Sequence, residues 1–129
     1  MPYNEANVSF KFPTTAAGAD DDQDMPWPFK GEWMLDEVWF APETADAASA
    51  TNYAILTVET MDVVANLAAC TGTITNATVA FVVGTARSAT LGGAAVQVNY
   101  GDTIRIAKTE AGTGGVVFGV VTVTAHKVP

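Results

Sequence analysis

The single histidine and the single cysteine limit the chemistry that this chain could perform. His126 is the only histidine of the 129 residues, and Cys70 is the only cysteine. A transition-metal site takes three or four ligands of these types, so one of each is too few. A cysteine nucleophile needs a nearby base, and nothing in the sequence places His126 beside Cys70. We therefore expect no catalytic residues, no enzyme activity, no metal and no cofactor.

An acidic run from Asp20 to Asp24 has the residue spacing of the first ligands of a calcium loop. That loop also requires glycine at its sixth position and glutamate at its twelfth, where this chain has Met25 and Gly31. We therefore expect a solvated acidic loop. A looser calcium site, built from carboxylates that converge on the cation, is the alternative.

Two further patterns suggest a site without completing one. The run Gly112-Thr113-Gly114-Gly115 lacks the following lysine and helix of a phosphate-binding loop, so we expect a hairpin turn. Asp36 and Glu37 are adjacent in an expected strand, where neighbouring side chains point to opposite faces. They should therefore not form a pair of carboxylates for acid–base catalysis.

The three tryptophans raise the possibility of a sugar-binding face. Trp33 and Trp39 lie in the most strand-like segment of the chain, where we expect them to fill the core. Trp27 stands between Pro26 and Pro28 and is stiff, so little entropy is lost when it is ordered at an interface. Trp27 is therefore a candidate interface anchor, with local packing as the alternative.

The charge of the chain excludes some partners. The net charge is −8, and the acidic residues are concentrated in the first half of the chain, up to Asp62. Nucleic-acid binding needs clustered lysine and arginine, so we expect no nucleic-acid partner. No apolar run approaches the roughly 20 residues that cross a membrane, and the first residues do not resemble a secretion signal. We therefore expect a protein that is made in a cytosol and does not bind membranes.

The elements that must position any site are strands. Apolar and β-branched segments alternate with glycine, proline and polar turns from Gly31 onward, at 32–41, 53–59, 74–83, 95–100, 102–108 and 116–125. In the first of these, Trp33, Leu35 and Trp39 should share one face. Residues 61–70 read as strand plus loop, with a short helix as the alternative. Several short strands without strand–helix alternation predict an all-β, antiparallel β-sandwich or barrel.

The first thirty residues differ from the rest. Their prolines and acidic run argue against a regular central strand, so we expect an extended N-terminal arm at 1–30 and a β-sandwich domain at 31–129. Val8, Phe10 and Phe12 would share one face of the arm, and with Trp27 they are its candidate partner-binding residues. The alternative is that this segment is the first strand of the domain, followed by a long loop.

Two stretches resemble a known family. The first is Thr44-Ala45-Asp46-Ala47-Ala48-Ser49-Ala50-Thr51-Asn52-Tyr53-Ala54-Ile55-Leu56-Thr57-Val58. The second is Tyr100-Gly101-Asp102-Thr103-Ile104-Arg105-Ile106, followed by the turn at 109–114 and a final Val-Thr strand. Both are similar to stretches of the small decoration, or cement, proteins of tailed bacteriophage capsids. Residues 61–94 have no counterpart in the resemblance.

The resemblance implies a fold and a role. The fold is a jelly-roll-like β-sandwich. The role is to decorate the outer capsid surface of a virion by binding the major capsid protein, commonly as a homotrimer and sometimes through an N-terminal arm. Such a protein would be made in the host cytoplasm. Two alternatives stay open, namely a virion-displayed carbohydrate-binding or adhesion module, and a tail, neck or baseplate component of the same fold.

Overall fold

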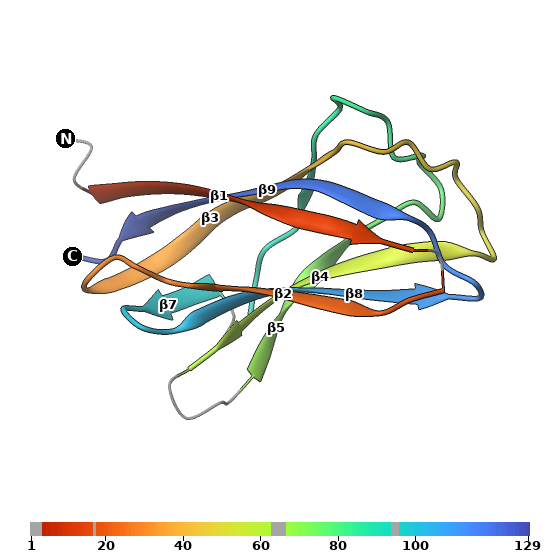
Figure 1. Ribbon diagram of the computed structural model, residues 1–129. Coiled ribbons are helices and arrows are strands. Elements are labelled where there is room, and N and C mark those ends of the chain that lie inside the picture. The colour runs from red at the N-terminus through yellow and green to blue at the C-terminus, as the bar shows by residue number, and fades with distance from the viewer. Residues whose placement is uncertain (1–3, 17, 63–66, 94–95) are drawn as a thin grey trace.

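The computed structural model describes residues 4–16, 18–62, 67–93 and 96–129, and the described residues form strands without an α-helix (Figure 1). The strands are β1 (Glu5–Thr15), β2 (Asp21–Pro26), β3 (Glu32–Pro42), β4 (Tyr53–Met61), β5 (Leu67–Thr75), β6 (Arg87–Ala89), β7 (Gln97–Asn99), β8 (Thr103–Ala111) and β9 (Val117–Lys127).

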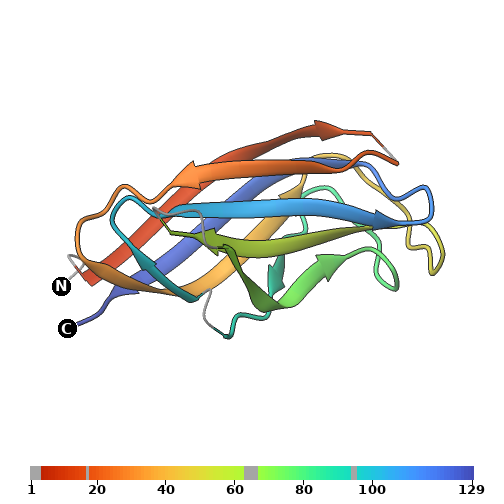
Figure 2. The same ribbon diagram turned by 90° about the horizontal axis from the view of Figure 1, so that it is seen from below.

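The strands form two antiparallel sheets that pack face to face (Figures 1 and 2). In the first sheet the order is β1-β9-β3-β6, and β7 also pairs with β3. In the second sheet the order is β2-β8-β4-β5. The predicted all-β, antiparallel β-sandwich is therefore confirmed.

The strand order is that of one long hairpin rolled up on itself. β4 pairs with β5 at the tip of the hairpin, β3 pairs with β6 and β7, β2 pairs with β8, and β1 pairs with β9 at its open end. The pairs β3·β9 and β4·β8 then join the turns of the roll into two sheets. This nesting of first strand with last strand is the arrangement of a jelly roll.

The core lies between the sheets and follows the two-residue period of the strands. Along β4 the inward side chains are buried at every second position and the outward ones are half-buried. β9 shows the same alternation. The largest fully buried apolar side chains are Phe12, Trp27, Phe40, Phe81, Leu56, Ile104, Ile106, Val38, Val58, Val98 and Val117.

The predicted faces of the third strand are wrong in its second half. The pairing of β3 with β9 shifts register between Leu35 and Glu37, which inserts one extra residue as a β-bulge. Trp33 and Leu35 therefore face the core as expected, but Trp39 faces outward and is half-buried. The bulge reverses the phase of the strand, and an argument from strict alternation cannot foresee it.

The predicted boundary between an arm at 1–30 and a domain at 31–129 is also wrong. β1 pairs along its length with β9, from Glu5 opposite His126 to Thr15 opposite Val117, and β2 pairs with β8. Both are edge strands, where a proline costs little because one side of the strand has no pairing partner. The proline-rich segment is thus part of the sandwich. This agrees with the alternative prediction in one respect, namely that the segment contains the first strand of the domain.

A buried lysine holds the connection between β1 and β2 against the body. The side chain of Lys108 is fully buried, and its amine donates to the carbonyl oxygens of Ala16 and Ala19 at 3.0 and 2.5 Å. It also forms an ion pair with Glu110 at 3.1 Å. The charge is therefore neutralised and hydrogen-bonded inside the fold.

The middle of the chain departs from prediction as well. The strand expected at 74–83 ends at Thr75, and the residues that follow form a loop up to β6. Of the segment 61–70, residues 67–70 belong to β5, whereas 63–66 lie outside the described residues. Gly112 and Gly114 adopt the positive φ expected of turn glycines, but their turn joins β8 of one sheet to β9 of the other and is no hairpin.

Candidate functional site

The four residues predicted to bind a partner divide into two pairs. Phe12 and Trp27 are 0% and 1% exposed, so the prediction that they contact a partner is wrong. Val8 and Phe10 lie half-buried on the edge strand β1 and pack against the core. Only Val8 and Phe10 therefore keep a surface that a partner could touch.

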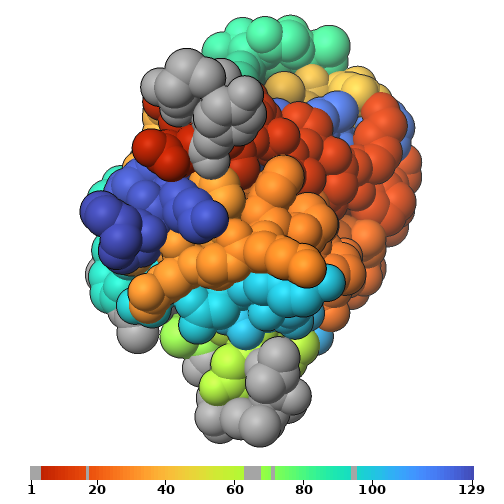
Figure 3. Space-filling model, turned by 90° about the vertical axis from the view of Figure 1, so that its left-hand side faces the viewer, coloured from red at the N-terminus to blue at the C-terminus, as the bar shows by residue number. Residues whose placement is uncertain are grey.

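The connection from β2 to β3 and the segment that leads into β8 lie side by side at one end of the sandwich (Figure 3). Trp27 belongs to the first of these segments and is buried. Its backbone N–H donates to the carbonyl of Asp102 at 2.7 Å, and its carbonyl accepts from Gly101 at 3.2 Å. Its ring lies edge-on to those of Phe29 and Trp33, with centroids 5.1 and 5.9 Å away. The flanking prolines thus fix a core residue. Of the two roles considered for Trp27, local packing is the one that the structure shows.

Exposed apolar side chains gather in the loop between β5 and β6. We call residues 76–86 the valine loop, because Val79, Val82 and Val83 there are 55%, 51% and 58% exposed. Among the described residues, the other large apolar side chain of comparable exposure is Tyr100. Its N–H donates to the carbonyl of Gly31, next to the start of β3, which lies beside Lys127 at the end of β9. Exposed clusters of large apolar side chains on a small protein commonly mark interaction sites.

A buried asparagine at the base of the valine loop holds three loops together. The side chain of Asn76 is fully buried; its Oδ1 accepts from the N–H of Ala54 at 2.9 Å. Its Nδ2 donates to Asp46 Oδ2 at 2.9 Å and to the carbonyl of Ala47 at 3.0 Å. The same Asp46 oxygen accepts from the N–H of Val116 at 3.1 Å. One polar network therefore joins the segments around residues 46, 76 and 116.

The tip of the valine loop is anchored to the core as well. Phe81 is buried against Phe40, with ring centroids 5.5 Å apart, and its backbone exchanges two hydrogen bonds with Asp46. The guanidinium of Arg87 lies over the Phe81 ring and donates to the carbonyl oxygen of Val79 at 3.2 Å. The exposed valines are thus displayed on a backbone that is fixed at several points, which lowers the entropy cost of binding through them.

The sequence contains only a weak signal for this surface. Val82 and Val83 are consecutive, and consecutive side chains of a strand point to opposite faces. Both could therefore be buried only in a strand covered on both faces, which a two-sheet sandwich does not offer at its ends. Val120 and Val121 are also consecutive, yet they lie in β9, so adjacency allows an exposed turn at Val82 and Val83 without singling it out.

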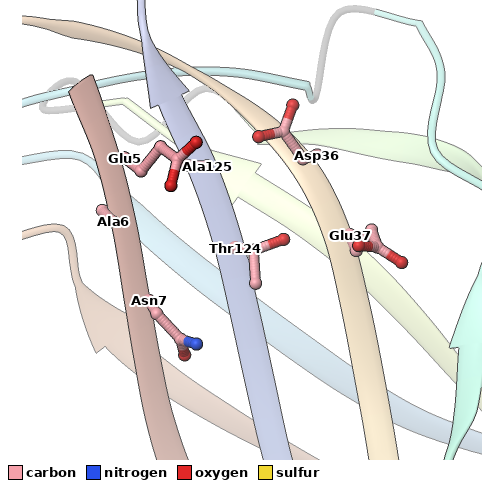
Figure 4. Close-up of a pocket in the computed structure, with 7 residues that line it drawn as sticks. All are labelled: Glu5, Ala6, Asn7, Asp36, Glu37, Thr124 and Ala125. Carbon is pink, nitrogen blue, oxygen red and sulfur yellow. The ribbon is translucent and has the colours of Figure 1, made fainter. Parts of the chain in front are cut away.

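A second surface lies on the outer face of the first sheet, beside the β-bulge. An open depression of about 580 Å³ is lined by Glu5, Ala6, Asn7, Asp36, Glu37, Thr124 and Ala125 (Figure 4). Because of the bulge, Asp36 and Glu37 are both exposed, so the prediction that they point to opposite faces is wrong. His126 Nδ1 lies 2.6 Å from a carboxylate oxygen of Asp36.

An aromatic ring lies next to this depression. Trp39 is half-buried on the same outer face, and its indole N–H donates to Glu37 at 3.0 Å. The hydroxyl of Thr124, which lines the depression, is buried without a hydrogen-bond partner among the described residues. The surface therefore combines an aromatic edge with several hydrogen-bonding groups.

The predicted acidic loop is an edge strand, and its charges are partly compensated. Asp22 and Asp24 lie on the outer face of the second sheet beside Arg105. Guanidinium nitrogens of Arg105 lie 3.6 Å from a carboxylate oxygen of Asp22 and 2.7 Å from one of Asp24. The hydrogen bond from Arg105 lowers the pKa of Asp24. Burial, followed by the charge of Asp22, raises the pKa of Glu59 on the neighbouring strand. Within the described part of the chain, no group of three or more His, Cys, Asp or Glu side chains could hold a metal ion.

No protein-family model, curated protein or solved structure matches the chain. In the described ranges no helix has the length and apolar character needed to cross a membrane.

Proposed function

We propose that the chain is a non-enzymatic virion structural protein that decorates and stabilises the capsid of a tailed bacteriophage by binding its major capsid protein. The observation that carries this proposal is the valine loop. It presents three exposed valines on a backbone anchored to the core of a jelly roll, a fold also used in viral capsid domains. The resemblance of residues 44–58 and 100–106 to capsid decoration proteins supports the same role.

The size of the valine loop fits repeated, individually weak contacts. Burying a whole valine side chain contributes at most about 1.5 to 3 kcal/mol, and these valines are already partly covered. The resulting affinity of one loop for an apolar pocket is modest. A second contact made by the same molecule raises the overall affinity without strengthening either contact, and a lattice of capsid subunits provides such repeated contacts.

The proposal is tested with the double variant Val82→Ser/Val83→Ser. Both side chains are more than half exposed, so the fold should keep its thermal stability. We expect co-sedimentation with expanded capsids to fall at least about tenfold, because apolar contacts worth more than about 1.4 kcal/mol are removed. Tyr100→Ser is the matched control, since it removes an equally exposed apolar side chain at another end and should leave binding intact.

Three results would count against the proposal. The purified chain fails to bind expanded capsids, or the double variant binds as well as the unchanged chain, or the chain is located on the tail, neck or baseplate. The last result would favour a role elsewhere in the virion with the same fold.

A second candidate function, a carbohydrate-binding or adhesion module, is favoured by the outer face of the first sheet. Trp39 there lies beside a depression lined by carboxylates, an amide and a hydroxyl, which are groups that bind sugar hydroxyls. If this is the function, a glycan panel should show binding that Trp39→Ala abolishes and Val82→Ser/Val83→Ser does not change. A panel without any binding contradicts it.

A further inference from the structure

The four edges of the two sheets are protected to different degrees. β6 and β7 are three residues each, too short to pair with another chain over any length. β2 carries Pro26 and three aspartates at its edge, which discourage pairing. β5 is partly covered, since the N–H of Gly72 donates to the carbonyl of Thr90 at 2.9 Å. Two of the four edges are therefore protected against a further strand, and the edge of β5 is protected in part.

The free edge of β1 is less protected over most of its length, because its charged residues are one glutamate, Glu5, and one lysine, Lys11, of opposite sign. β1 is eleven residues long, and among the described residues it pairs with β9 alone. Its one proline, Pro13, lies beyond Phe12, where the pairing with β9 becomes irregular. Val8 and Phe10 are only half-buried beside this edge. A long, unprotected edge with apolar side chains at its rim is a surface onto which another strand can add.

The residues of β1 are complementary to β1 itself in one antiparallel register. Directly opposed residues share a face, so polar positions must meet polar positions and apolar ones must meet apolar ones. A register centred on Val8 places Glu5 of each copy opposite Lys11 of the other. It also places Asn7 opposite Ser9 on the outer face, and Ala6 opposite Phe10 on the inner face. Both charged pairs are of opposite sign, and the small Ala6 leaves room for the large Phe10.

The neighbouring registers are worse. A register centred on Ser9 sets Glu5 against Pro13, which has no N–H to donate. It also sets Lys11 against Asn7 and loses both ion pairs. A shift by a single residue would place the apolar face of one copy against the polar face of the other. The register centred on Val8 is thus favoured by charge, by size and by face.

We propose that the free edge of β1 binds β1 of a second copy of this chain, giving a two-fold symmetric dimer with one sheet continuous across both copies, in place of the homotrimer that the resemblance implies. The pairing uses Glu5–Lys11 and covers the exposed parts of Val8 and Phe10. The valine loop lies away from the termini and from this edge, so the dimer leaves it accessible (Figure 1). A two-fold contact of this kind is self-complementary and closes after two copies.

The charge of the whole molecule opposes this pairing at low ionic strength. Each copy carries a net charge of −8. At about 0.15 M salt, charges more than roughly 8 Å apart are screened, whereas the directly opposed Glu5 and Lys11 are screened less. Dimerisation should therefore be measured at this salt concentration or above.

Charge reversal provides the test. Sedimentation equilibrium of the purified chain should give about twice the monomer mass of 13.4 kDa at high protein concentration. Glu5→Lys and Lys11→Glu each put like charges opposite one another in both outer pairs, so each variant alone should be weakened at least about tenfold in dimerisation. A mixture of the two variants restores opposite charges in both pairs and should form the heterodimer.

A matched control and a stability measurement make the outcome decisive. Glu32→Lys reverses an exposed carboxylate on another strand and should leave dimerisation unchanged. Lys11 also contacts Glu43 within the same copy, so each variant is checked for an unchanged melting temperature. The proposal is overturned by a monomer at every concentration, by a trimer, by single reversals that still dimerise, or by a mixture that does not.

Discussion

Asn76 shows at the scale of one residue how the valine loop is fixed. Its side chain is fully buried, and its three hydrogen bonds reach Ala54, Asp46 and Ala47. Gly115 packs so closely on this network that a Cβ there would collide with the Asp46 carboxylate. Three loops therefore depend on one amide.

Asn76→Ala should be among the most destabilising single substitutions outside the apolar core. It leaves the N–H of Ala54 without its partner and removes one of the two hydrogen bonds to Asp46 Oδ2, and an unsatisfied buried group costs about 1 to 3 kcal/mol. We expect a loss of about 3 kcal/mol in the free energy of unfolding, measured with urea. Asn99→Ala, at an exposed position on β7, should change it by less than about 0.5 kcal/mol. Equal effects of the two substitutions would contradict this account of the loop.

Glu59 gives a prediction for the pH dependence of stability. Burial and the nearby Asp22 raise its pKa in the folded state, so ionisation is harder in the folded chain than in the unfolded one. Protonated Glu59 therefore favours the folded state. This contribution to the free energy of unfolding is fully present below the unfolded pKa of about 4.5 and is lost as the pH rises through the raised folded pKa. Glu59→Gln should therefore stabilise the chain at pH 7, by up to about 1 kcal/mol for a partly exposed charge.

The companion substitution Asp24→Asn should have the opposite sign. The hydrogen bond from Arg105 lowers the pKa of Asp24, so its contribution is present above 3.8 and is lost as the pH falls through the lowered value. Thermal melts of both variants from pH 3 to pH 7 check the pair. The gain from Glu59→Gln should vanish at the acidic end, and a gain that is independent of pH would contradict the assignment.

At the scale of the element, the first two strands decide whether the body can fold alone. β1 and β2 cover β9 and β8, and Phe12 and Trp27 belong to the core. Replacing one buried phenylalanine by alanine costs about 3 to 5 kcal/mol, a large part of a total stability of about 5 to 15 kcal/mol. We therefore expect a chain that lacks residues 1–30 to lose cooperative unfolding in urea, whereas one shortened only to the start of β1 should keep it. If the chain without residues 1–30 still folds, the prediction of a separate N-terminal arm is supported after all.

The same strands show how far the sequence predicts this fold. Alternation predicts the two-sheet sandwich, and turn residues predict most connections. The argument from alternation fails at β3, where one extra residue at Asp36 reverses the faces on which Glu37 and Trp39 lie. It fails again at β2, because an acidic, proline-ended segment becomes a strand only when β8 offers it a partner. Local sequence carries the period of a strand, whereas a bulge and an edge pairing depend on the partner strand.

The valine loop could not be assigned as a site for a related reason. Apolar residues at 79–83 fit a buried strand as well as an exposed loop as long as their neighbours are unknown. Asp46 decides between the two, because it bonds both Asn76 and the backbone of Phe81 and turns the chain away from β5. These partners lie some thirty residues apart in the sequence, and periodicity carries no information about such contacts.

At the scale of the whole molecule, the termini and the valine loop lie apart, and this arrangement predicts the orientation on a capsid. Glu5 is paired opposite His126, so both chain ends lie at one end of the sandwich, away from the loops around residues 46, 76 and 116 (Figures 1 and 2). If the valine loop docks, both termini face away from the bound surface. A large domain fused there should not interfere with binding.

A pair of fusions tests this orientation without changing any contact residue. A fluorescent protein joined after Pro129 should leave capsid binding within about twofold, since it adds no contact and removes none. The same protein inserted between Gly84 and Thr85 should abolish binding, because it stands beside Val82 and Val83. Resistance of the sandwich part to limited proteolysis checks that each fusion keeps the fold. If instead the terminal fusion blocks binding and the inserted one does not, the docking surface lies at the end where β1 begins and β9 finishes, and the valines must serve another purpose.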